Sequence, residues 1–187
     1  MNALDAINNR RAVRDYVQEP LEEATIGRLI DAAVQAPSAI NRQDWLFVAV
    51  TDQASLDSIA HKAKVHALAQ LASTPLLSGF REHLSKPEFN IFYNAPALVV
   101  ICALAPDRMA EQDCCLAAEN LMLAARAEGV GSCWIGFAED WLGLPEAKAE
   151  LGLPQAARPV APIILGRPKA WPASPGRRPA KIHWIRG

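Results

Sequence analysis

The chain has 187 residues, of which 51% are hydrophobic and 21% are charged, so it can bury a sizeable core and is not a disordered chain. Its formal net charge of -1 excludes a global field that would attract nucleic acid or an anionic membrane. The length predicts a single domain over residues 1–187.

The termini and the cysteines indicate a cytoplasmic protein. The first residues are polar and include three arginines, so we expect no signal peptide. No stretch approaches the roughly 20 apolar residues that a membrane-spanning helix needs. Because no CxxC pair is present, we expect buried thiols, not a metal site or disulfides. The cysteines are Cys102, Cys114, Cys115 and Cys133.

Two patterns organise the first half of the chain. One pattern is apolar residues at helical spacing, such as Leu4 and Ile7. The other is a single short run of β-branched and aromatic residues, which is typical of a strand. Pro37 ends the second predicted helix, because proline disfavours helix in the residue before it. The predicted elements are helices at residues 2–9, 21–35 and 55–71 and a buried strand at residues 45–51.

The second half contains a long central helix and further strands. The helix at residues 113–128 is apolar on nearly all sides, which predicts a place in the core or in a subunit interface. Gly129 is its predicted C-terminal stop. Residues 133–137 are compatible with either a strand or a loop. The remaining elements are strands at residues 97–103 and 160–165 and a helix around residues 145–151.

Two segments lack a regular pattern. Residues 61–93 are predicted to include a lid-like excursion over a site, because their second half mixes prolines and glycine with aromatic residues. The C-terminal arm, residues 167–187, contains four prolines and cannot be helical. With Trp171, Trp184 and Ile185 as apolar anchors, we expect the arm to lie on a second subunit.

Positive charge gathers at both ends of the chain. Arg10, Arg11 and Arg14 lie within five residues of one another, and the C-terminal arm carries six basic residues and no acidic one. Guanidinium groups bind phosphate through charge-assisted, bidentate hydrogen bonds. Each cluster alone also fits a solvated basic face, but two clusters in a nearly neutral chain indicate a specific anion. The basic residues of the arm are Arg167, Lys169, Arg177, Arg178, Lys181 and Arg186.

Two further segments carry candidate ligand contacts. Residues 36–45 (APSAINRQDW) form a loop whose amide side chains suit the edge of a heterocycle with C=O and N–H groups; a plain connector fits equally well. Residues 128–136 (EGVGSCWIG) follow a helix and lack the spacing of the dinucleotide fingerprint, which excludes a Rossmann site. Their glycines permit close approach of the backbone to a flat ligand.

The chain resembles the nitroreductase family of FMN-dependent oxidoreductases at five places that follow the family's order. The resemblance implies an α/β (α+β) nitroreductase-like fold with a central, mainly antiparallel sheet flanked by helices. It also implies an intertwined homodimer with an extended C-terminal arm and two FMN sites in the subunit interface. The matching segments are RRAVRDY (10–16), APSAINRQDW (36–45), NAPALVV (94–100), AENLMLAARAEGVGSCWIG (118–136) and PIILGRP (162–168).

The resemblance assigns FMN contacts to residues of this chain. Arg10 and Arg11 match residues near the ribityl phosphate, and Arg14 matches a cation beside the pyrimidine edge, where it would stabilise the reduced flavin. Arg177 and Arg178 fall where the family has a second phosphate-binding cation, and either could serve. The other matches are Ala12, the loop donated by the partner subunit (Pro37, Ser38, Ala39, Asn41, Gln43) and the segment packed by the isoalloxazine (Trp134, Ile135, Gly136).

Three positions depart from the family pattern. Ala12 and Ala39 stand where serine is usual, and Asp44 replaces the usual proline before Trp45, which puts a carboxylate near the site. Each lost neutral hydrogen bond costs about 1 kcal/mol. That is small beside the about 12 kcal/mol that holds a nanomolar cofactor, so we expect FMN binding to survive.

Several other residues keep a structural interpretation beside a functional one. Asn120 needs a partner inside the apolar helix, which favours helix or dimer packing over flavin contact. Phe89, Phe92 and Tyr93 either line the flavin pocket or pack in the core. Three histidines lack the spacing of a helical metal pair, so we expect no metal and place them on the surface: His61, His66 and His83.

The resemblance implies an NAD(P)H-dependent FMN oxidoreductase. Hydride would pass from NADH or NADPH to flavin N5 and on to a small oxidised acceptor such as a nitroaromatic or a quinone, without a catalytic side chain. Alternatives within the fold are dehalogenation, destruction of the flavin to form a cobalamin ligand, and oxidation of peptide-derived heterocycles. Alternatives of another class are a flavin-binding regulatory or storage protein and a flavin-free scaffold. The expected partners are a second copy and a small-molecule acceptor, not nucleic acid or a membrane.

Overall fold

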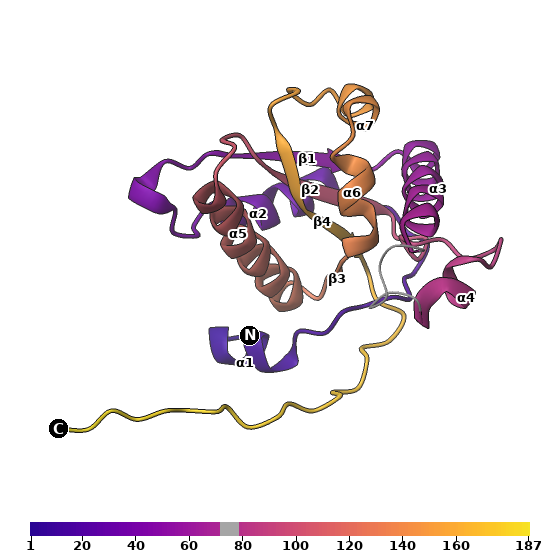
Figure 1. The fold of residues 1–187 in the computed structure, drawn as a ribbon. Helices are drawn as coiled ribbons and strands as arrows, with labels where there is room; N and C mark the ends of the chain where they lie inside the picture. The colour runs from indigo at the N-terminus through magenta and orange to yellow at the C-terminus, as the bar shows by residue number, and fades with distance from the viewer. Residues whose placement is uncertain (72–78) are drawn as a thin grey trace.

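The structure is a computed structural model that describes residues 1–71 and 79–187. Helices and strands alternate irregularly along it (Figure 1). The elements are α1 (Ala3–Asn9), α2 (Glu23–Ala33), η1 (Ala39–Asn41), β1 (Trp45–Val50), α3 (Gln53–Gln70), α4 (Arg81–Leu84), β2 (Ala97–Ala103), α5 (Arg108–Ala127), β3 (Gly131–Trp134), η3 (Gly136–Ala138), α6 (Glu139–Leu142), α7 (Pro145–Glu150) and β4 (Arg158–Gly166).

A four-stranded sheet in the order β1-β2-β4-β3 lies at the centre, and each neighbouring pair is antiparallel. All seven residues of β2 are buried. Because successive side chains of a strand point to opposite faces, Leu98 and Val100 join one core while Val99 and Ile101 join another. The predicted antiparallel sheet flanked by helices is confirmed.

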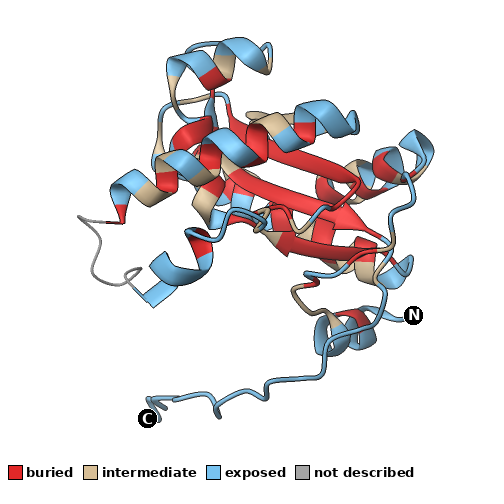
Figure 2. Cartoon of the chain, turned by 90° about the vertical axis from the view of Figure 1, so that its right-hand side faces the viewer, coloured by how far each residue is buried: buried red, intermediate tan, exposed pale blue. Residues whose placement is uncertain are grey.

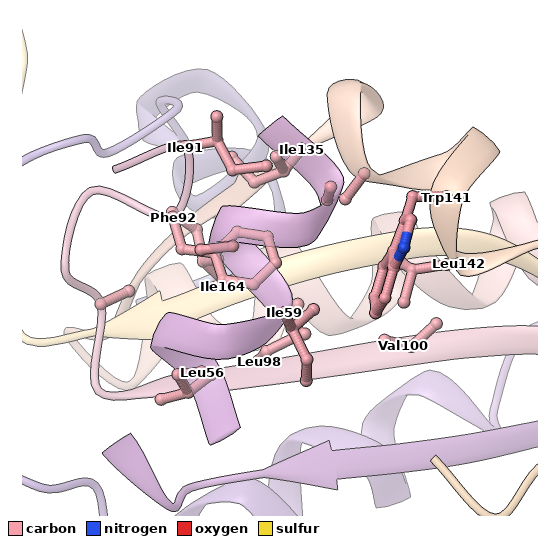
Figure 3. Close-up of a cluster of buried hydrophobic side chains, with 14 of the residues drawn as sticks. Leu56, Ile59, Ile91, Phe92, Leu98, Val100, Ile135, Trp141, Leu142 and Ile164 are labelled. Atoms are coloured by element: carbon pink, nitrogen blue, oxygen red, sulfur yellow. The ribbon is translucent and has the colours of Figure 1, made fainter. Parts of the chain in front are cut away.

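Helices cover both faces of the sheet (Figure 1). On one face, α3 and α6 pack their apolar side chains, including Ile59 and Trp141, against β2 and β4 (Figure 3). On the other face, α2 and α5 contribute Leu29 and Leu121 to the second core. Figure 2 shows the buried residues concentrated in the sheet and on the inward sides of these helices.

The central helix α5 begins at Arg108, so the predicted start at residue 113 is wrong. Asp107 is its N-cap, since the Asp107 side chain accepts a hydrogen bond from the backbone amide of Ala110 at 3.0 Å. Arg108, Glu111 and Gln112 interrupt the apolar pattern before residue 113, so apolar periodicity does not reveal this turn. The predicted stop is confirmed: Gly129 follows the helix with a φ of +76°, which glycine adopts without strain.

Residues 133–137, which the sequence allows as either a strand or a loop, are divided between the two. Residues 131–134 form β3 against β4, and Ile135 leads into η3. The strand predicted at residues 160–165 is therefore the fourth in chain order and extends over residues 158–166. The second predicted helix is shorter than expected, because α2 spans residues 23–33 and not 21–35.

The C-terminal arm is extended and exposed along most of its length (Figure 2). It contains no helix, as its prolines predicted. Within residues 1–71 and 79–187, no helix is both long and apolar enough to cross a membrane.

Candidate functional site

The arginine motif near the N-terminus lies against β3. The backbone amide of Val13 donates to the carbonyl of Ser132 at 3.0 Å, and Ala12 forms a bridge with the same residue. This close approach requires glycine at position 131, because a Cβ there would lie 2.9 Å from the Val13 side chain. We expected a flat ligand as the reason for this glycine; the structure shows a neighbouring segment of the chain instead.

A second close approach joins three of the sequence segments. Tyr16 is buried, and its hydroxyl donates to the carbonyl of Val13 at 2.7 Å. A Cβ at Gly166 would lie 2.7 Å from both the Tyr16 ring and Pro96. The segments at residues 10–16, 94–100 and 162–168 therefore meet around Tyr16, and their packing holds the arginine motif in place.

The first cavity, here called the aromatic cavity, has a volume of about 350 Å³, which lies at the low end of the range for small-molecule sites. Three of the residues matched to the isoalloxazine segment lie in its wall, namely Trp134, Ile135 and Gly136. The complete lining is Arg14, Ala67, Gln70, Leu71, Phe89, Ile91, Tyr93, Cys133, Trp134, Ile135, Gly136, Phe137 and Asp140. A mainly apolar and aromatic wall of this kind suits a flat heterocycle.

The second cavity, here called the arginine cavity, has a volume of about 330 Å³. Arg14 lines both cavities, so they adjoin. Arg177 of the C-terminal arm lies in its wall, whereas Arg178 is not among the lining residues. The lining is Arg10, Arg11, Ala12, Arg14, Pro172, Ala173, Pro175 and Arg177. Four arginines from the two ends of the chain thus line one cavity, and arginine is well suited to bind an anion.

The arginines of this cavity are held by different contacts. Arg10 forms an ion pair with Glu119 of α5 at 3.6 Å, and Nη1 of Arg11 donates to the Asn8 carbonyl at 2.9 Å. The guanidinium of Arg14 lies 5.9 Å from the centre of the Tyr93 ring. Tyr93 itself has a φ of +53°, a strained conformation of the kind that accumulates at functional sites.

Burial changes the protonation of groups beside the aromatic cavity. It raises the pKa of the Cys133 thiol and of the Tyr93 hydroxyl, and the positive charge of Arg14 opposes both shifts. Burial also raises the pKa of Glu139, whose Oε1 accepts a hydrogen bond from the indole of Trp134. The thiol is therefore protonated at neutral pH, which disfavours a role as a nucleophile.

The amide-rich loop at residues 36–45 lies away from both cavities. In Figure 1 it projects beyond α5, on the opposite side of the molecule from α3 and α4. Ile40, Asn41 and Gln43 have φ angles of +50°, +57° and +56°, and such a conformation is unusual for a β-branched residue. Within this chain, none of Pro37, Ser38, Ala39, Asn41 and Gln43 lines either cavity.

Two carboxylates of α5 and its N-cap hold this strained loop. Asp113, which is only 5% exposed, accepts hydrogen bonds from the backbone amide of Ala39. Arg42 forms ion pairs with Asp107 and with Asp44, each at 3.0 Å. The carboxylate expected near a ligand, that of Asp44, is thus paired within the loop.

The residues of the expected lid lie in several elements. Residues 61–70 belong to α3, and residues 72–78 fall outside the described residues. Phe89 and Tyr93 line the aromatic cavity, whereas Phe92 is buried in the core. The lid itself stays a prediction.

The remaining polar residues that the sequence singled out lie in different surroundings. His83 stacks on Phe89 with ring centres 4.0 Å apart, His61 is exposed, and His66 is half-buried. Asn120 donates to the carbonyl of Ala32 in α2 at 3.4 Å, as the helix-packing interpretation predicted. In the part of the chain that the structure describes, no group of three or more His, Cys, Asp or Glu residues could hold a metal ion.

Sequence reasoning missed several residues of the site. Phe137 and Asp140 line the aromatic cavity, but they follow the matched segment and lie in η3 and α6. Glu139, which fixes the Trp134 indole, was missed for the same reason. Asp113 could have been noticed as a carboxylate in an apolar helix, since a buried charge needs a partner.

The four-stranded antiparallel sheet between two helical layers is a nitroreductase-like fold. The chain belongs to the nitroreductase family: the model of this family, described as "Nitroreductase family", matches residues 7–167. The fold is shared by a solved nitroreductase with bound FMN from Bacteroides fragilis, at a TM-score of 0.85 and 27% identity, with 100% of each chain covered.

Two relatives of similar identity carry names that assign different activities. A protein of Archaeoglobus fulgidus, whose name provisionally assigns an NADH dehydrogenase/NAD(P)H nitroreductase, is 30% identical over 171 residues, 89% of this chain and 85% of its own length. A 5,6-dimethylbenzimidazole synthase of Rhodospirillum rubrum is 30% identical over 181 residues, 90% of this chain and 83% of its own length.

Proposed function

We propose that the protein is an FMN-dependent oxidoreductase that takes electrons from NADH or NADPH and passes them to a small oxidised acceptor, such as a nitroaromatic or a quinone. The observation that carries the proposal is the pair of adjoining cavities with Arg14 in both walls. FMN combines a flat apolar ring system with a phosphate. The aromatic cavity suits the ring system, and the arginine cavity suits the phosphate. The FMN in the solved Bacteroides fragilis relative supports this choice of cofactor.

The chain's own residues divide the work of binding. Arg10, Arg11 and Arg177 surround the arginine cavity and would hold a dianionic phosphate. Arg14 stands at the boundary of the two cavities, where a fixed positive charge would favour a more negative ligand. When bound, FMN would supply the hydride-transfer chemistry.

No side chain need act as a nucleophile or a general acid in this proposal. Cys133 lies in the wall, but burial keeps its thiol protonated. Phe89 and Phe137 offer ring faces and edges on which a planar acceptor can pack. The protein therefore contributes position, electrostatics and exclusion of water.

We also propose that the protein acts as a homodimer whose FMN site is completed by the loop at residues 36–45 of the partner. In support, large apolar side chains are exposed on α1 and α5, including Leu4 at 69% and Leu116 at 46%. Ile40, at the tip of the strained loop, is 93% exposed. Sedimentation should show a dimer, and a monomer that retained FMN would contradict the shared site.

The proposed setting is the cytoplasm, with residues 1–187 acting as one FMN-binding domain. All four cysteines are free, which suits a reducing compartment, and both cores lie against one sheet. The proposed partners are a second copy and a small-molecule acceptor, not nucleic acid or a membrane.

One experiment tests the reductase assignment directly. The FMN-loaded protein is mixed anaerobically with NADH and, separately, with NADPH while the absorption of the oxidised flavin is followed. Bleaching within seconds by at least one nucleotide is expected. Bound FMN that neither nucleotide bleaches would point to a flavin-binding protein without reductase turnover. A colourless protein that does not bind added FMN would indicate a flavin-free scaffold.

The second candidate function is destruction of the flavin, which the similarity to the Rhodospirillum rubrum synthase favours. The reduced protein is exposed to oxygen, and the flavin is recovered and analysed. A reductase returns intact FMN, whereas a flavin-consuming enzyme converts it to a smaller product.

A further inference from the structure

Trp171 at the start of the C-terminal arm stacks on Arg126 in the last turn of α5. The guanidinium carbon lies 3.6 Å from the centre of the ring, well within the distance of a cation–π contact. Nε of Arg126 is buried and has no hydrogen-bond partner among the described residues. The ring face of Trp171 is therefore a principal partner of this guanidinium.

Among the described residues, the hydrogen bonds, ion pairs and ring contacts that tie the arm to the body of the protein end at this pair. Before it, Lys169 is held to Asp15 by an ion pair at 2.8 Å and by a backbone hydrogen bond at 3.2 Å. Beyond Trp171, the hydrogen bonds of the described residues stay within the arm, such as that from the Gly176 amide to the Ser174 hydroxyl at 3.2 Å. Trp171 is thus the last side chain that anchors the arm before it reaches the arginine cavity.

The connection from Trp171 to Arg177 is short and partly restricted. Pro172 and Pro175 restrict their own φ angles, and Gly176 turns the chain with a φ of +78°. A guanidinium nitrogen of Arg177 also donates to the Gly176 carbonyl at 2.9 Å. Because only five residues separate them, an anchored Trp171 limits how far Arg177 can move from the cavity.

We propose that the Trp171–Arg126 stack is a positioning pair that holds Arg177 against Arg10, Arg11 and Arg14 in the arginine cavity. The inference rests on the proposed function only in that the cavity receives the phosphate of FMN. Arg126 lines neither cavity. Through Trp171 it would nevertheless affect how strongly the protein distinguishes a phosphorylated flavin from an unphosphorylated one.

The test compares dissociation constants of FMN and riboflavin, which share the ring system and differ in the phosphate. In Trp171→Ala and Arg126→Met, FMN should bind up to about tenfold more weakly while riboflavin binding changes little, as expected for loss of a partly exposed cation–π contact. Trp171→Phe keeps an aromatic face and should retain most of the preference for FMN. Trp184→Ala is the matched control, because this exposed tryptophan contacts the neighbouring Arg186.

The outcomes are distinguishable from failure of the proposed function. A wild-type protein that binds FMN and riboflavin equally well would overturn the phosphate site and, with it, this inference. A wild-type preference for FMN that persists in Trp171→Ala would overturn the positioning role alone. Equal losses in Trp171→Ala and Trp184→Ala would also overturn it, because any change in the arm would then suffice. Far-ultraviolet circular dichroism checks that each variant is folded.

Discussion

The backbone amide of Ala39 donates a hydrogen bond to both carboxylate oxygens of Asp113, at 3.2 and 3.1 Å. The two residues are 74 positions apart, so a buried charge of α5 holds the amide-rich loop. The contact explains how a short loop with three non-glycine residues at positive φ keeps one conformation.

Replacement of Asp113 should release this loop. Asp113→Ala leaves the Ala39 amide without its acceptor, which should lower the free energy of unfolding by about 1–3 kcal/mol. Asp113→Asn keeps one acceptor oxygen and should cost less. Hydrogen exchange of the Ala39 amide measures the release, and Gln112→Ala, an exposed neighbour on α5, is the control. Unchanged exchange in Asp113→Ala would contradict the role of the carboxylate.

The two adjacent arginines of the arm should differ in their effect on FMN. Arg177 lines the arginine cavity and Arg178 does not. Loss of a charge-assisted hydrogen bond should make Arg177→Ala bind FMN roughly 10- to 100-fold more weakly. Arg10→Ala should behave in the same way, whereas Arg178→Ala should have little effect. Fluorescence titration of the apoprotein with FMN gives the three affinities. A larger loss in Arg178→Ala than in Arg177→Ala would reverse the assignment.

Gly131 should tolerate no side chain, because an added Cβ would lie 2.9 Å from Val13. Gly131→Ala should lower stability by about 1–3 kcal/mol through overpacking, and it should weaken FMN binding by displacing Arg10 and Arg14. Thermal unfolding and FMN titration measure the two effects. Gly27→Ala is the control: nothing lies within 4 Å of its Cβ, so it should be neutral or stabilise α2 by about 0.5–1 kcal/mol. If both variants proved equally stable, the close packing of Val13 would not matter.

Glu139 should lower the free energy of unfolding as the pH rises. Burial raises the pKa of this carboxyl above its ordinary value of 4.5, so the folded protein keeps a proton that the unfolded chain has already lost. The contribution of Glu139 is therefore complete below pH 4.5 and is lost as the pH rises through the raised pKa.

Glu139→Gln should flatten this dependence, because the amide oxygen still accepts from the Trp134 indole but does not titrate. Urea midpoints recorded upward from pH 4.5 compare the two proteins. Glu146→Gln, an exposed change on α7, should leave the wild-type profile intact. Parallel profiles for wild type and Glu139→Gln would show that Glu139 does not carry the effect.

The sequence pattern predicts the bounds of a helix or strand well where residues of one kind dominate it. The strand predicted at residues 97–103 has the bounds observed for β2, since a fully buried strand is a continuous apolar run. The helix stop at Gly129 was equally clear. The start of α5 was missed because Arg108, Glu111 and Gln112 interrupt the apolar pattern. The strand β3 could not be told from a loop, because its four residues become a strand only by pairing with β4.

The sequence by itself determined the family and the two clusters of arginines, because each follows from residue types at fixed spacing. The antiparallel α/β class followed from the resemblance to the family. Only the tertiary structure decided which arginine of the arm joins the motif near the N-terminus. The structure also brings Trp171 against Arg126 and Val13 against Gly131. Both contacts join residues far apart in the chain, so no local pattern could specify them.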